Sequence, residues 1–220
     1  MAEGEGETGQ YLYYLNGTLA EVEEHWIAKP QQENATLVRT HRKVPGLLIS
    51  VEAILAGKEV TSFEVIWAAE GKDEIKAIYS RQESTLMFSR SVGELATHVS
   101  SDLPTMDGPV VPYPLMRVFT GAVIQQLAQA GGEARVLVPA IDEPDNPQAL
   151  LLPKISLRRV IQGDAVMLER ANGASVACEQ WQFIGGQYDA RARFWLDGSG
   201  RLQRYCWQQD DDRCWDIRLL

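Results

Sequence analysis

PYPLMRVFTGAVIQQLAQA (Pro112–Ala130), followed by Gly131 and Gly132, is the segment of this 220-residue chain with the pattern of a long amphipathic helix. Apolar residues recur at steps of three and four, which places them on one face of a helix. This face contains Leu115, Val118, Phe119, Ala122, Val123, Gln126, Leu127 and Ala130. Pro112 and Pro114 suit a first helical turn, where a missing N–H costs little, and Gly131 suits a left-handed cap.

Two small residues interrupt this helical segment. Thr120 and Gly121 lie near its middle, and a glycine inside a helix costs about 1 kcal/mol relative to alanine. We expect a small residue here to allow a close approach to another surface. The apolar stripe is expected to pack against a sheet, and lining a ligand cleft is the alternative interpretation.

Most of the remaining chain has the pattern of short strands separated by turns. Asn16-Gly17 and Asn172-Gly173 are strong hairpin signals. Strands that recur about every 7–10 residues with turn signals between them are typical of an antiparallel meander. The predicted strands are Tyr11–Leu15, Leu19–Ile27, Ala35–His41, Leu47–Leu55, Val60–Ala69, Ile75–Ser80, Leu86–Ser91, Leu95–Val99, Ala134–Ile141, Ile155–Ile161, Ala165–Arg170, Ala174–Ile184, Gln187–Leu196, Arg201–Gln208 and Cys214–Leu219.

These elements predict a mainly β (α+β) fold. We expect a large curved antiparallel sheet of about ten or more strands, beyond the usual size at which open sheets curl. It forms an incomplete β-barrel, with one principal helix packed on its concave side. Residues 1–9 are rich in Gly and Glu and are predicted to be a disordered tail. Residues 10–220 are predicted to form a single β-rich domain, since no flexible linker flanks the helix.

The composition limits the classes of partner that the protein is expected to bind. The net charge is −9 with a sequence pI near 4.9, which argues against nucleic acid because phosphate neutralisation needs clustered Lys and Arg. No apolar run approaches the length of a membrane-spanning helix. The first residues, MAEGEGETGQ, lack the features of a signal peptide. We therefore expect a cytoplasmic location for the chain as given, or a periplasmic or exported one if it has been trimmed. The sequence leaves the oligomeric state open.

Motifs for chemistry are scarce. His25, His41 and His98 are scattered, and the three cysteines, Cys178, Cys206 and Cys214, contain no CxxC pair. No GxSxG elbow and no phosphate-binding glycine motif occurs. We predict no metal and no cofactor, and we assign no catalytic residue.

The aromatic residues are the most suggestive set. Six tryptophans in 220 residues is a high content. A buried Trp needs a hydrogen-bond partner for its N–H, so Trp is favoured where a surface is partly exposed to solvent, as at the opening of a pocket. Ordinary core packing is one interpretation; a cavity for an apolar ligand is the other. The residues expected to line such a cavity are Phe63, Trp67, Phe119, Val123, Trp181, Phe183 and Trp195.

Three segments carry a resemblance to a known family. Pro114–Gln126, the run GGQYD at Gly185–Asp189, and the late strand pair FWLDGSGRLQRYCW beginning at Phe194 are similar, in element order, to the lipoprotein-carrier-like superfamily. It includes periplasmic lipoprotein carriers and related bacterial proteins of unknown function. The resemblance implies an incomplete barrel whose helix plugs the concave side, and a concave side that takes up acyl chains or another apolar group. The missing export signal is a departure from that family.

The sequence thus favours a non-enzymatic protein that binds a lipid or other hydrophobic small molecule between the sheet and the helix. One alternative is a cofactor-independent enzyme that uses the same cavity with His41 or His98 as the base. Another is a protein–protein interaction module that uses an exposed edge strand or the acidic loop near Asp142.

Overall fold

The computed structural model describes residues 6–32, 34–82, 85–93, 99–103, 110–170, 173–189 and 191–220. The first half of the chain forms strands β1 (Glu7–Leu15), β2 (Thr18–Pro30), β3 (Ala35–Val44), β4 (Leu47–Ala56), β5 (Glu59–Ala69), β6 (Ile75–Gln82), β7 (Thr85–Val92) and β8 (Val99–Leu103). The second half forms β9 (Val110–Pro112), a 3-10 helix (Arg117–Phe119), α1 (Thr120–Gln129), β10 (Glu133–Pro139), β11 (Pro153–Glu169), β12 (Ser175–Ile184), β13 (Arg193–Asp197), β14 (Leu202–Gln208) and β15 (Cys214–Leu219).

All fifteen strands belong to one sheet, in the order β8-β7-β6-β5-β4-β3-β2-β1-β15-β14-β13-β12-β11-β10-β9. Strands that are neighbours in sequence are neighbours in the sheet, as expected for hairpins, except β8 and β9, which form its two edges. The pairing of β1 with β15 joins the two halves of the chain in the middle of the sheet. Every pair is antiparallel except β9 with β10. The predicted antiparallel meander is therefore confirmed.

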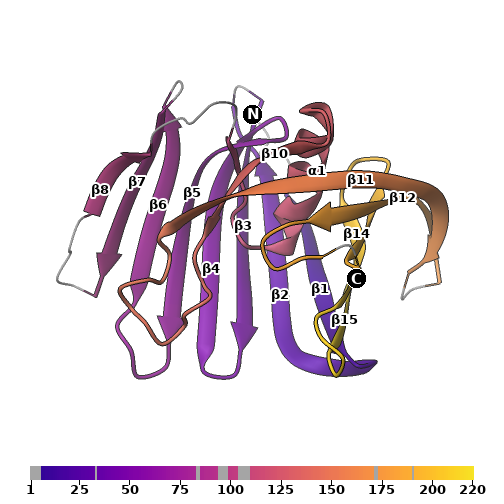
Figure 1. Cartoon of the computed structure of the whole chain (residues 1–220), viewed down its shortest axis with the longest axis horizontal. Helices are drawn as coiled ribbons and strands as arrows, with labels where there is room; N and C mark the ends of the chain where they lie inside the picture. Colours follow the sequence, from indigo (N-terminus) through magenta and orange to yellow (C-terminus); the bar gives the residue numbers. More distant parts are fainter. Residues whose placement is uncertain are drawn as a thin grey trace.

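The sheet is curved and does not close. In Figure 1, β11 crosses in front of the strands of the first half. The edge strand β9 contacts β5. The concave side encloses the core because strands alternate apolar and polar residues. On β5, for example, Phe63, Val65 and Trp67 point inward, whereas Glu64 and Ile66 point outward. The predicted curved sheet with one helix on its concave side is confirmed.

The helix begins later than the sequence pattern predicts. Pro112 ends β9, and two tight turns follow, in which the N–H of Leu115 donates to Tyr113 and that of Met116 donates to Pro114. Leu115 has a positive φ of 63°, which no helix accommodates. The prediction that Pro112 and Pro114 form the first helical turn is thus wrong.

The end of the helix agrees with the prediction. Gly131 has a φ of 92° and Gly132 one of 94°, and their N–H groups donate to Ala128 and Leu127, as in a glycine cap. Within the described residues, no helix is long and apolar enough to cross a membrane.

Three strand boundaries differ from prediction. Residues Glu7–Gly9, placed in the disordered tail, pair with β2. The predicted turn at Gln162-Gly163 is a register shift inside the continuous strand β11. The predicted strand Gln187–Leu196 begins only at Arg193, because Gly185 and Tyr188 close a tight turn instead. Residues 95–98 of the predicted strand Leu95–Val99 lie outside the described residues.

The close approach expected at Gly121 is confirmed. A Cβ at this position would overlap the carbonyl oxygen of Gly200, in the turn between β13 and β14. Gln126 donates to the carbonyl of Lys58 at 3.0 Å, and the Nζ of Lys58 donates to the carbonyl of Ser199 in the same turn at 3.1 Å. The helix thus contacts both turns, and Val123, Ile124 and Leu127 are fully buried.

Candidate functional site

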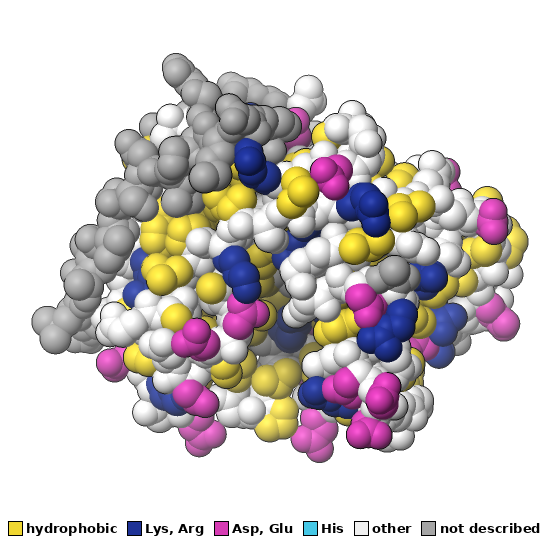
Figure 2. Space-filling view, in the orientation of Figure 1, with side chains coloured by type: hydrophobic (Ala, Val, Ile, Leu, Met, Phe, Trp, Pro, Cys, Tyr) yellow, Lys and Arg dark blue, Asp and Glu magenta, His cyan; other side chains and the backbone are white. Residues whose placement is uncertain are grey.

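A hollow of about 330 Å³ opens where β3, β10 and the 185–188 turn meet beside the 3-10 helix. Figure 2 shows the face on which it opens, with basic side chains inside a central depression. The segments around it are far apart in sequence. The lining residues are Arg42, Tyr113, Leu115, Arg117, Val138, Pro139, Ala140, Ile141, Asp142, Lys154, Arg158, Gly186, Gln187 and Tyr188.

Arg158 is the most unusual residue of this lining. Its side chain is only 7% exposed, although it lies on β11 between the exposed residues Leu157 and Arg159. Its guanidinium packs over the ring of Phe183, 5.3 Å from the ring centre, and its hydrogen-bond partner is the hydroxyl of Ser156, at 3.4 Å. Burial lowers the pKa of Arg158, because removal from water destabilises a charged group.

The space around Arg158 depends on a glycine. A Cβ on Gly186 would lie 2.5 Å from a guanidinium nitrogen of Arg158, and Gly186 has a positive φ of 63°. The GGQYD run thus forms a turn whose backbone passes close to the buried cation.

Arg117 is the second cation of the hollow. Its Nη1 donates to the hydroxyls of Tyr188 at 2.7 Å and of Tyr113 at 3.4 Å, while its Nε is buried without a partner. Its guanidinium also lies 4.9 Å from the ring centre of Tyr205. Burial alone would raise the pKa of Tyr188, but the adjacent Arg117 outweighs burial and lowers it. Among the described residues, no carboxylate lies within ion-pair distance of Arg117 or Arg158.

Glu24 fixes the position of this cluster. Its side chain is 0% exposed. Its Oε2 accepts from Arg42, whose Nη2 is at 2.6 Å and Nε at 2.8 Å, and also from the hydroxyl of Tyr13. Its Oε1 accepts from the backbone N–H of Arg117 at 2.6 Å. Because Glu24 binds the backbone of Arg117, the side chain of Arg117 remains available to the hollow.

The segment that leads into Arg117 is strained. A leucine at a φ of 63° costs about 1–2 kcal/mol, and such residues persist only where their surroundings hold them. Here the carbonyl of Leu115 accepts from Arg42 at 3.4 Å, and the side chain of Leu115 is buried.

The opposite rim carries a neutralised pair. Lys154 binds Asp142 at 2.5 Å, and both side chains are more than half exposed. An exposed pair of this kind contributes little to stability. The uncompensated positive charge of the hollow therefore comes from Arg117 and Arg158.

The residues predicted to line a ligand cavity lie elsewhere. Six are buried in the core: Phe63, Trp67, Phe119, Val123, Trp181 and Phe183. Trp67 also borders a hollow of about 710 Å³ near Leu150. Trp195 lies on the other face of β13 from the buried Phe194, and Arg204 packs over its ring. None of these seven residues lines the hollow that contains Arg117 and Arg158.

The histidines proposed as bases are not brought to the hollow either. His41 points to the outer face of β3, opposite to the buried Thr40. His98 lies outside the described residues.

Sequence reasoning missed Glu24, Arg117 and Arg158. A signal existed for Glu24, which shares its strand face with Val22 and Trp26, and for Arg158, which alternates in phase with Val160. A charged residue in phase with buried ones must be paired or serve a site.

Comparisons with protein-family models, with curated proteins and with solved structures found no significant match. The resemblance to the lipoprotein-carrier-like superfamily therefore stays a prediction.

Proposed function

We propose that this protein binds a small apolar molecule that carries an anionic group. The single observation behind this proposal is Arg158, a buried guanidinium that borders a hollow and lacks a carboxylate partner among the described residues. The anionic group would lie between Arg158 and Arg117. The apolar part would contact Leu115, Val138 and Ile141, which line the same hollow.

Electrostatics supports an anionic ligand. An unpaired buried charge is costly, and hydrogen bonds between a guanidinium and a carboxylate or phosphate are among the strongest in proteins. A bound anion would supply the opposite charge that Arg158 lacks.

The size of the hollow restricts the apolar part. A volume of about 330 Å³ is at the lower end of the range of about 300–1,000 Å³ for ligand pockets. A single aromatic ring or a medium-length alkyl chain suits this space. The ligand proposed here is therefore an amphiphilic organic acid, which is a narrower class than the lipid or other hydrophobic small molecule predicted from the aromatic content.

The lining favours binding over chemistry with a histidine base. Its fourteen residues contain no histidine and no cysteine, and its carboxylate, Asp142, is paired with Lys154. Binding of an acid without any reaction requires only the two arginines, the tyrosine hydroxyls and the apolar part of the lining.

The proposal is tested by calorimetric titration with 4-bromobenzoate and octanoate, each compared with the neutral alcohol of the same skeleton. We expect the acids to bind and the alcohols to bind at least tenfold more weakly. R158Q is expected to weaken acid binding by about 10–100-fold, because a hydrogen bond to a charged group contributes about 1.5–3 kcal/mol.

R159Q is the matched control, because Arg159 is the next residue on β11 and is exposed. It should bind the acids as the parent protein does. Circular dichroism and thermal unfolding establish that both variants fold. Equal acid affinity in R158Q and R159Q, or equal affinity for acids and alcohols, would reject the proposal.

A further inference from the structure

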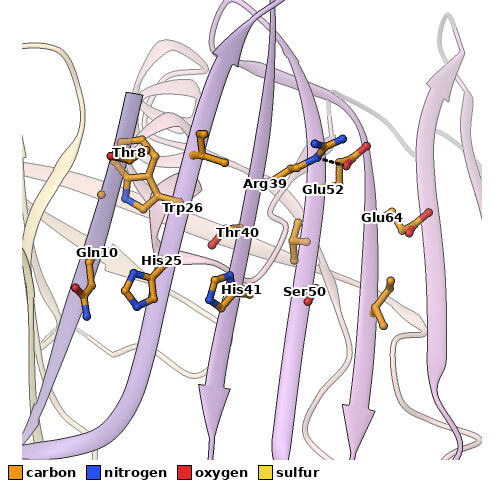
Figure 3. Close-up of a pocket in the computed structure, with 14 residues that line it drawn as sticks. Thr8, Gln10, His25, Trp26, Arg39, Thr40, His41, Ser50, Glu52 and Glu64 are labelled. Carbon is orange, nitrogen blue, oxygen red and sulfur yellow. Dashed lines mark hydrogen bonds and ion pairs between the residues drawn. The ribbon is translucent and has the colours of Figure 1, made fainter. Parts of the chain in front are cut away.

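Another hollow, of about 680 Å³, lies on the outer face of the sheet over β1 to β5. Figure 3 shows its polar side chains, which come from neighbouring strands. One row runs straight across four of them, because the register pairs Gln10 with His25, His25 with His41, and His41 with Ser50. Two of the three histidines of the chain thus lie side by side, although they are 16 positions apart in the sequence.

The two imidazoles face each other without other partners. Their ring centres are 5.4 Å apart and their planes differ by 26°. Neither ring makes a hydrogen bond or an ion pair with another described residue. His25 is half-buried and His41 is exposed, so a solute can reach both rings.

We infer that His25 and His41 together bind one divalent transition-metal ion. Neutral imidazole is a common ligand of such ions, and zinc–nitrogen bonds are about 2.0–2.1 Å long. Two imidazoles on one tetrahedral ion therefore have ring centres roughly 5 Å apart, close to the spacing observed here. His41 is exposed, and exposed side chains rotate freely, so its ring can turn a nitrogen towards a point shared with His25.

Oxygen ligands flank the pair. The amide of Gln10 and the hydroxyl of Ser50 lie on either side of the histidines in the same row. Among the described residues, no three His, Cys, Asp or Glu side chains form a group that could hold an ion. The site is therefore an open one, with two imidazoles and with water or these oxygens in the other positions.

The surrounding charges do not oppose a cation. Arg39, which precedes His41 on the same strand face, binds Glu52 at 2.6 Å. Lys43, on the other side, lies opposite Glu23. Glu64, at the edge of the hollow, binds Lys76 at 2.7 Å. Cu²⁺ should bind more tightly than Ni²⁺ or Zn²⁺, in the usual order for nitrogen sites.

The inference is tested by titrating the full chain with Cu²⁺ and Zn²⁺ in calorimetry. The titration uses the C206S/C214S background, because Cys214 is exposed and Cys206 is half-buried. We expect one Cu²⁺ per chain, with Zn²⁺ weaker. H25Q and H41Q should each weaken Cu²⁺ binding at least tenfold, and electron paramagnetic resonance should detect two nitrogen ligands in the parent.

H98Q is the control, since His98 is the third histidine, and it should bind Cu²⁺ as the parent does. Thermal unfolding without metal confirms that each variant folds. Unchanged Cu²⁺ affinity in H25Q and H41Q would overturn the inference. So would a spectrum with a single nitrogen ligand, or a loss of affinity in H98Q equal to that in the other two variants.

Discussion

Glu24 illustrates what one buried carboxylate does for the parts of the chain around it. It accepts hydrogen bonds from side chains on β1 and β3 and from the backbone of the 3-10 helix. Its four donors satisfy both oxygens, which is the condition under which a buried charge is tolerated. Through Arg117, the same contacts position one wall of the hollow.

The substitution E24Q should therefore destabilise the protein strongly. It would leave Arg42, whose side chain is only 14% exposed, without an opposite charge. The loss of one partner from a buried pair costs about 3–5 kcal/mol in unfolding free energy. Chemical denaturation measures this difference.

E23Q provides the comparison, because Glu23 is the preceding residue on β2 and is exposed. Its unfolding free energy should stay within about 0.5 kcal/mol of the parent value. If E24Q and E23Q were equally stable, Glu24 would not have the role assigned to it here.

Single residues were only partly predictable from the sequence. The alternation of β2 places Glu24 on the inward face, but its partner Arg42 and the backbone of Arg117 come from other segments. The opposition of His25 and His41 follows from a hairpin centred near residue 33, yet it requires the register to be known. Local patterns predict the direction of a side chain, whereas its partners depend on the folded chain.

At the scale of elements, α1 and the turn from Asp197 to Arg201 approach so closely at Gly121 that there is no room for a Cβ atom there. Asp197 accepts hydrogen bonds from the N–H groups of Ser199 and Arg201. These bonds fix the turn, and they present the carbonyl of Gly200 to the helix at Gly121.

G121A tests this contact. Alanine favours a helix by about 1 kcal/mol over glycine, so an uncrowded position would be stabilised. Here the new methyl group meets the backbone of Gly200 and Leu202, and overpacking of this kind costs about 1–3 kcal/mol. We expect a net loss of unfolding free energy in chemical denaturation.

G198A is the matched control in the same turn, at a position where a Cβ meets nothing within 4 Å. It should be neutral to within about 0.5 kcal/mol. A stabilised G121A would mean that the helix and the turn are not packed as described.

Elements were predictable where the signal is local. Alternation and Asn-Gly turns located the hairpins, because each hairpin forms from adjacent residues. The start of the helix was not predictable from sequence, because the positive φ of Leu115 depends on distant residues. Arg42 binds the carbonyl of Leu115, and Glu24 binds the backbone of Arg117 two residues later. The length of β11 was also missed, because a bulge at Gln162-Gly163 resembles a turn in sequence.

At the scale of the whole molecule, the curl of the sheet creates the hollow. β10, the 185–188 turn and β3 meet only because the sheet folds over itself, as Figure 1 shows. The sequence predicts a curved sheet from its many strands. It does not reveal which inward residues contact one another, and so the seven aromatic and apolar residues chosen from pattern occupy positions other than the lining of this hollow.

The account rests on an anion-binding hollow between Arg117 and Arg158. The most direct measurement is a crystal structure of the protein with bound 4-bromobenzoate, in which anomalous scattering locates the bromine. We expect the carboxylate within hydrogen-bond distance of both guanidinium groups and the bromine near Val138 and Ile141. Bromine density elsewhere, or an empty hollow at a saturating concentration of the acid, would contradict the account.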